Sequence, residues 1–220
     1  MTDTQDRQKK FQSAFVLFFI GQIFLIVGAF SIGSKFKFLP AWIEYLAFFV
    51  MLGYIFLIIS VLRIYRYNQN FKNSAIAMGF TSALTIIGDI ASKSTEDFYI
   101  YWAKGFNWSS SITLCIFYVY FFLGCYDYFT AEDQSEAMKH SRTGFIVFPI
   151  LFITQSLLEA GPDFPIIKYN LIANRVCVYS SWIMSFVIYF FVIALLANIV
   201  IYMHKLKKKE GEINETSKAS

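Results

Sequence analysis

The sequence predicts an all-α integral membrane protein, a bundle of six transmembrane helices with both termini in the cytoplasm. Of its 220 residues, 57% are apolar and only 15% are charged, whereas soluble domains carry about 25% charged residues. Aromatic residues make up 20% of the chain. Since a helix needs about 20 apolar residues to cross a membrane, a chain of this length has room for a small bundle but not for a soluble catalytic domain as well.

Six apolar segments account for most of the chain. They are expected to span the membrane at about residues 13–33, 40–62, 75–92, 110–129, 144–160 and 176–203. Pro40 suits the first turn of the second span, and Arg63 follows the end of that span. The last segment is longer than a span needs, so it is expected to tilt or to project into the cytoplasm.

The segments between and beyond the spans are polar or rich in aromatic rings. Residues 1–12 are expected to form a short cytoplasmic segment, and residues 204–220 a basic, disordered cytoplasmic tail. The longest connection, residues 92–109, gathers Phe, Tyr and Trp, which is typical of a segment that lies in the lipid headgroup layer. It is therefore predicted to be interfacial.

The distribution of Lys and Arg predicts the orientation. With six spans, thirteen of the nineteen basic residues fall on the side that holds both termini, and six fall on the other side. Cytoplasmic loops carry the excess of basic residues in membrane proteins. Both termini are therefore expected in the cytoplasm, and the chain is expected to cross the cell membrane several times.

Charged residues near the outer ends of the spans are the first candidates for a ligand-binding site. Glu44, Asp89, Glu159 and Arg175 map there, with three carboxylates against one guanidinium. One interpretation is an outward-facing vestibule, built by spans 2, 3, 5 and 6, that attracts a solute, a cation or a proton. The other is structural: Glu44 would stabilise the start of its helix, and Glu159 would pair with Arg175 across the connection between spans 5 and 6. Asp89 is the acid expected to face the bundle interior.

Three amides lie deeper in the apolar segments, at Gln22, Gln155 and Asn198. They are further candidates for lining a solute path, although amides also join helices without any other role. Pro149 interrupts the fifth span, which predicts a kink that would suit a gate.

Small residues at helical spacing predict close packing between helices. Ala75, Gly79 and Ala83 are four residues apart in the third span, so they form a flat ridge against which a neighbour is expected to pack. Gly21 and Gly28 in the first span are interpreted in the same way.

The sequence offers no motif that would support catalysis or a bound cofactor. It lacks a phosphate-binding loop, the paired histidines of zinc proteases and the serine motif of hydrolases. We therefore predict no catalytic residue, no metal site, no cofactor and no nucleic-acid partner. The leading hypothesis is a small transport-type protein that binds a solute or ion between its helices. The alternative is a non-catalytic accessory or scaffold subunit that packs against another membrane protein, and a lipid-modifying enzyme ranks third.

Overall fold

The computed structural model describes residues 3–33, 47–92 and 97–219, and these ranges contain helices and turns but no strand. Its main helices are α1 (Asp3–Gly33), α2 (Ala47–Ile64), α3 (Gln69–Ser92), α4 (Asp97–Ala131), α5 (Ser135–Ala160) and α7 (Leu171–Ala219). A 3-10 turn, η2 (Gly161–Asp163), and the short helix α6 (Pro165–Lys168) join α5 to α7.

Five of these helices are long and apolar enough to cross a membrane. The qualifying stretches are Lys9–Gly28, Gln69–Ser92, Trp102–Ala131, Ser135–Asp163 and Leu171–Met203. The apolar stretch of α2, Phe48–Ile64, is shorter, and the predicted start of its span at residue 40 lies outside the described residues. Within the described part, five membrane-length helices and one shorter apolar helix therefore stand where the sequence predicts six spans.

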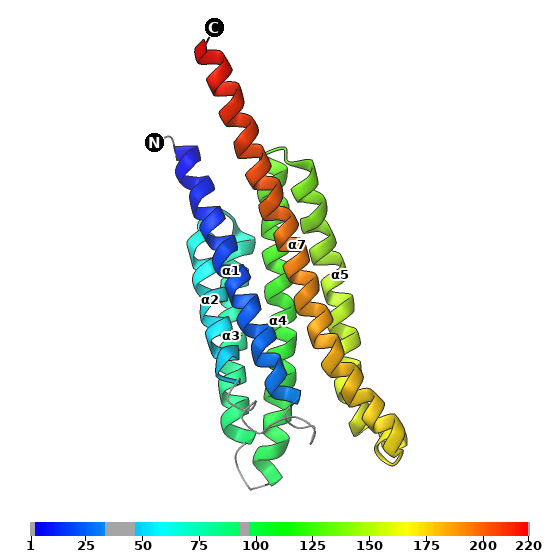
Figure 1. Cartoon of the computed structure of the whole chain (residues 1–220). Coiled ribbons are helices and arrows are strands. Elements are labelled where there is room, and N and C mark those ends of the chain that lie inside the picture. The colour runs from blue at the N-terminus through cyan, green and yellow to red at the C-terminus, as the bar shows by residue number, and fades with distance from the viewer. Residues whose placement is uncertain (1–2, 34–46, 93–96, 220) are drawn as a thin grey trace.

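The main helices form a closed ring in which neighbours run in opposite directions (Figure 1). Each main helix packs against the one before and the one after it in the chain, and α7 also packs against α1. Both termini consequently lie at the same end of the bundle (Figure 1). We call this the terminal end, and the opposite end, where η2 and α6 join α5 to α7, the far end.

Aromatic side chains from α1 and α4 fill the centre of the ring. Phe11, Phe15 and Phe18 recur every three or four residues on α1, so they share one face, and that face is fully buried. Phe11 stacks on Tyr128 of α4 with ring centres 3.8 Å apart, and Phe18 lies 4.0 Å from Phe121. The apolar side chains on the opposite faces remain on the surface of the bundle, as expected for helices whose outer solvent is lipid.

A ladder of hydroxyl groups joins α3 to α4. Ser74 donates a hydrogen bond to the carbonyl oxygen of Phe117 (3.0 Å), and the hydroxyls of Thr81 and Thr113 are 2.9 Å apart. Further along, the hydroxyls of Thr85 and Ser110 are 2.6 Å apart. Because water is absent from the membrane interior, these hydroxyls bond to polar groups of the neighbouring helix.

Replacing Thr81 by valine should weaken this interface. Thr81 is fully buried, and valine keeps its shape while it removes the hydrogen bond to Thr113. We expect the free energy of unfolding in detergent micelles to fall by about 1 kcal/mol. Thr143→Val is the matched control, because the exposed Thr143 hydroxyl bonds only within its own helix, to the carbonyl oxygen of Lys139. Equal losses in the two variants would contradict an interhelical role for Thr81.

Two segments that the sequence predicts to lie outside the six spans are helical. Helix α4 begins at Asp97, so most of the connection predicted as interfacial is a helical extension of the fourth span. Helix α7 continues to Ala219, past the ends of its neighbours (Figure 1), where a disordered tail is predicted. Extending an existing helix needs no new nucleation, so a polar continuation can remain helical without packing.

The small residues of α1 pack as predicted, whereas of the predicted ridge on α3 only Ala75 packs against the core. A Cβ atom on Gly21 would lie 3.0 Å from the carbonyl oxygen of Gly53, so α1 and α2 cross in close contact there. A Cβ on Gly79 would have no other atom within 4 Å, and Ala83 is exposed. The prediction of a packing ridge on α3 is therefore wrong. Helix α3 buries a different face, which holds Phe71, Ser74, Ala77, Met78, Thr81 and Gly88.

Candidate functional site

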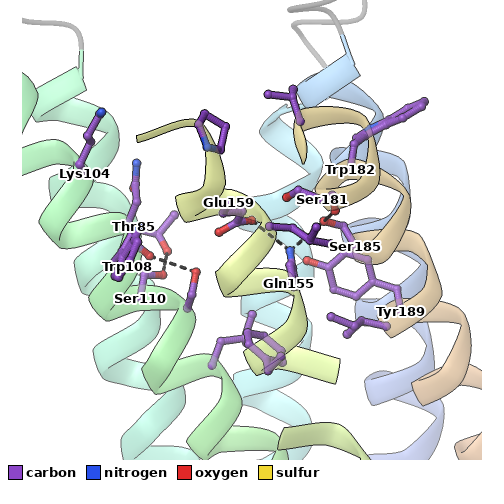
Figure 2. Close-up of a pocket in the computed structure, with 18 of the residues that line it drawn as sticks. Thr85, Lys104, Trp108, Ser110, Gln155, Glu159, Ser181, Trp182, Ser185 and Tyr189 are labelled. Atoms are coloured by element: carbon purple, nitrogen blue, oxygen red, sulfur yellow. Dashed lines mark hydrogen bonds between the residues drawn. The ribbon is translucent and has the colours of Figure 1, made fainter. Parts of the chain in front are cut away.

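A cavity of about 530 Å³ opens between α2, α3, α4, α5 and α7 at the far end of the bundle. Figure 2 shows its polar side chains projecting from several helices toward a shared space. Ligand-binding pockets typically have volumes of about 300–1,000 Å³, so this one is large enough for a small organic molecule.

The central wall of the cavity comes from α5 and carries an amide and a carboxylate. Gln155 and Glu159 are four residues apart and share a helical face, and Gln155 Nε2 donates a hydrogen bond to Glu159 Oε1 (3.1 Å). The same nitrogen donates to the Ser185 hydroxyl of α7 (2.8 Å), and Ser185 donates in turn to the carbonyl oxygen of Ser181 (3.2 Å). One continuous hydrogen-bonded chain therefore connects α5 with α7 (Figure 2).

The facing wall comes from α3 and α4. The Thr85 and Ser110 hydroxyls, 2.6 Å apart, lie on the other side of Gln155 and Glu159 from the two serines of α7 (Figure 2). Thr85 also donates to the carbonyl oxygen of Thr81 (2.9 Å). These hydroxyls are the last step of the ladder that joins the two helices, so the same interface that holds α3 to α4 positions this wall.

An ion pair links two sides of the cavity. Lys104 Nζ of α4 lies 2.8 Å from Asp163 Oδ1 of η2, and both side chains are more than half exposed, at 58% and 60%. Because exposed pairs contribute about 0–1 kcal/mol, this pair is not a major source of stability. Its importance is positional, since it bridges α4 and the connection between α5 and α7.

Aromatic rings line the remaining surface and close the inner end. Trp108 and Trp182 come from α4 and α7, and Phe152 of α5 lies deeper. Phe152 contacts Phe148 with ring centres 5.1 Å apart, and Phe148 lies 4.3 Å from Tyr118 at the centre of the ring. Below the cavity, the bundle is therefore filled with rings.

The structure places only two of the predicted site residues in this cavity, Gln155 and Glu159. Gln22 is fully buried and exchanges hydrogen bonds with the Tyr118 hydroxyl (2.7 and 3.0 Å), so it joins α1 to α4 beneath the cavity. Asn198 is exposed on the outer surface of α7, well away from the cavity lining. Glu44 lies outside the described residues.

Asp89 does not face the bundle interior as predicted. Its side chain is exposed, while its neighbour Gly88 is buried against Asn107 and Phe106 of α4. Successive residues of a helix point about 100° apart, so burying Gly88 turns Asp89 away from α4. Asp89 lies one turn beyond Thr85 and interacts electrostatically with Tyr54, which lines the cavity. It is therefore adjacent to the cavity without lining it.

The predicted clamp between Glu159 and Arg175 is not formed, although the structure describes both residues. Helix α7 begins at Leu171, so Arg175 lies in its second turn with an exposed side chain and does not mark the start of the helix. Among the described residues, the ion pair at this end is the one between Lys104 and Asp163.

Several cavity residues were not identified from the sequence. Ser110, Ser181, Ser185 and Lys104 belong to this group. The spacing of Ser181 and Ser185, four residues apart in an otherwise apolar helix, is a signal that could have found them. Lys104 could not be recognised as a cavity residue, because the sequence predicts a connection before residue 110, where the structure has part of α4.

No family model, curated protein or solved structure matches this chain. The fold and the cavity alone therefore define its class: a helical protein with membrane-length apolar helices and a polar cavity at one end. Within the described part of the chain, no group of three His, Cys, Asp or Glu side chains is placed to hold a metal ion.

Proposed function

We propose that the chain crosses the cell membrane six times with both termini in the cytoplasm. Two observations support this. Both termini lie at one end of the bundle, as an even number of crossings requires (Figure 1), and thirteen of the nineteen basic residues belong to the side that holds them. In this orientation, the cavity opens at the outer face of the membrane.

Cysteine labelling tests the orientation. Thr2→Cys and Lys218→Cys, each made after Cys115, Cys125 and Cys177 have been replaced by alanine, should resist an impermeant thiol reagent applied to intact cells. Both should react once the membrane is made permeable. Labelling of either terminus in intact cells would show that the orientation, or the even number of spans, is wrong.

We propose further that the protein is a transport-type protein that binds a small solute or ion in the cavity. The observation that carries this proposal is the convergence of Thr85, Ser110, Gln155, Glu159 and Ser185 on one space among apolar helices. Polar groups at membrane depth are costly, so they usually face a partner or a ligand path. A purely structural bundle would not need a cavity lined by them.

Transport through the bundle would require the rings below the cavity to move. Phe148, Phe152 and Tyr118 close the inner end, and Pro149 lies between the two phenylalanines on α5. A proline leaves one carbonyl of its helix without an amide partner, which makes the helix easier to bend at that point. This supports α5 as the moving element of a gate.

Filling the cavity with a bulky side chain tests directly whether it binds a ligand. Ser111 lines the cavity and is partly exposed, whereas Ser109 of the same helix lies outside it. Purified wild-type protein should be stabilised against heat by at least one class among small amines, carboxylates, sugars and alkali-metal ions. Ser111→Trp should abolish that stabilisation, and the matched Ser109→Trp should retain it. Equal stabilisation of the two variants would contradict the proposal. A wild-type protein that none of these classes of compound stabilises would contradict it as well.

A second function, an accessory or scaffold subunit, is favoured by the outer surface of α7. Asn198 is exposed there between apolar side chains, including Phe190 and Ile201. An amide on a lipid-facing surface gains about 0.6–2 kcal/mol when it bonds to another helix. Under this hypothesis, Asn198→Leu should release a co-purifying membrane protein in mild detergent, and an unchanged composition would count against it.

A further inference from the structure

The hydrogen bonds around the cavity indicate which kind of ligand it can accept. A hydroxyl carries one proton and two lone pairs, so each hydroxyl donates once. The Thr85 hydroxyl lies 2.9 Å from the carbonyl oxygen of Thr81. At the Thr85–Ser110 contact of 2.6 Å either hydroxyl can donate, and Ser110 also lies 3.4 Å from the Thr81 carbonyl oxygen, so both protons are used in either arrangement. Both protons are used within α3 and at its contact with α4, so the Thr85 and Ser110 hydroxyls offer only lone pairs to the cavity.

The protons of Gln155 and Ser185 on the opposite wall are used in the same way. Gln155 Nε2 donates to both Glu159 and Ser185, which accounts for its two protons. The amide cannot be turned the other way, because its oxygen would then face the carboxylate of Glu159, and a carboxylate only accepts. Ser185 donates to the carbonyl oxygen of Ser181. Gln155, Glu159 and Ser185 are therefore left with acceptors toward the cavity.

The charges of the cavity favour a cation. Its charged lining residues are Lys104, Glu159 and Asp163, and Lys104 pairs with Asp163. One carboxylate more than ammonium groups therefore surrounds the space, and apolar walls strengthen its field. Trp108 and Trp182 are also among the lining residues, and indole rings attract cations.

We propose that the ligand of this cavity is a small protonated amine with an apolar body. Its N–H groups would donate to Glu159, to the Gln155 oxygen and to the serine hydroxyls, while the aromatic walls would hold the apolar part. This inference rests on the proposed function, because it names the substrate class of the same cavity.

Four probes of similar size separate charge from hydrogen bonding. Benzylammonium has both a positive charge and N–H donors, benzyltrimethylammonium has the charge alone, benzyl alcohol is neutral, and phenylacetate is an anion. In calorimetry on the full chain in lipid nanodiscs, benzylammonium should bind at least tenfold more tightly than each of the other three. Tighter or equal binding of benzyltrimethylammonium, benzyl alcohol or phenylacetate would overturn the proposal.

A variant pair assigns the effect to the cavity. Glu159→Gln removes the negative charge but can still accept the hydrogen bond from Gln155, and it should weaken benzylammonium binding at least tenfold. Glu136→Gln is the matched control, since Glu136 is an exposed carboxylate in the first turn of the same helix, at the terminal end. It should bind benzylammonium as the wild type does. Equal affinities for the two variants would contradict the role of Glu159, and the probe series on the wild type still decides the ligand class if Glu159→Gln does not fold.

The outcomes also separate this inference from the proposed function. Binding of phenylacetate or benzyl alcohol that is lost in Ser111→Trp would leave a ligand-binding cavity but refute the amine. No binding of any of the four probes to the wild type would refute the amine as well, and the wider compound panel would then decide whether the cavity binds solutes at all.

Discussion

Replacing Gly144 by valine should destabilise the protein more than any other single change at a glycine of α3 or α5. A Cβ at Gly144 would lie 2.5 Å and 2.6 Å from two ring carbons of Phe122, which is fully buried on α4. The ring cannot move without displacing the packed centre of the bundle. We expect a loss of about 3 kcal/mol in the free energy of unfolding, at the upper end of what overpacking costs. Thermal unfolding in detergent micelles measures it.

Gly79→Val is the matched control for this prediction. Gly79 also lies inside a helix, but a Cβ there would meet no atom within 4 Å. Valine is a better helix former than glycine, so stability should stay the same or rise slightly. If Gly79→Val were as damaging as Gly144→Val, α3 would pack through its predicted ridge after all.

Replacing Phe18 by alanine should have a comparable effect through the opposite change, the loss of packed volume. Phe18 is fully buried and lies 4.0 Å from Phe121 and 5.7 Å from Phe117, measured between ring centres. Removing it leaves a void between α1 and α4, at a cost of about 3–5 kcal/mol. Pulse proteolysis at increasing denaturant concentration measures this loss in the free energy of unfolding without heating the protein.

Phe80→Ala makes the same chemical change on the surface. Phe80 is 61% exposed on α3, so it faces lipid in the membrane and leaves no internal void when it is truncated. Its loss should cost less than about 1 kcal/mol. Similar effects at Phe18 and Phe80 would mean that the aromatic centre between α1 and α4 does not hold the ring together.

The helical membrane fold could be predicted because it depends on composition over long segments. An apolar run of 20 residues is unmistakable, whereas the exact ends of a helix depend on neighbours that a single sequence does not reveal. Asp97 begins α4 and Ala219 ends α7, yet both lie in polar surroundings that argue for connections or tails. The number of spans remains a proposal for the same reason, because the described part of α2 is short.

The candidate site could be predicted only in part because the sequence does not show which way a side chain points in the membrane. In a soluble helix, the polar face marks the outside, but here both the inner and the outer faces are apolar. Polarity identifies Gln155 and Glu159, which line the cavity. The same criterion selects Asn198, which is exposed on the outer surface of α7 and does not line the cavity. The serines of the cavity were missed because hydroxyls are common in membrane helices.

The most direct test of the central claim is the accessibility of one cavity position from outside the cell. Ser111→Cys, made after Cys115, Cys125 and Cys177 have been replaced by alanine, lies in the cavity wall. We predict that an impermeant methanethiosulfonate reagent labels it in intact cells and that benzylammonium slows this labelling. Ser141→Cys, at a fully buried position of α5, should resist the reagent from either side. Labelling of Ser111→Cys from the cytoplasmic side alone would contradict an outward-facing, ligand-binding cavity.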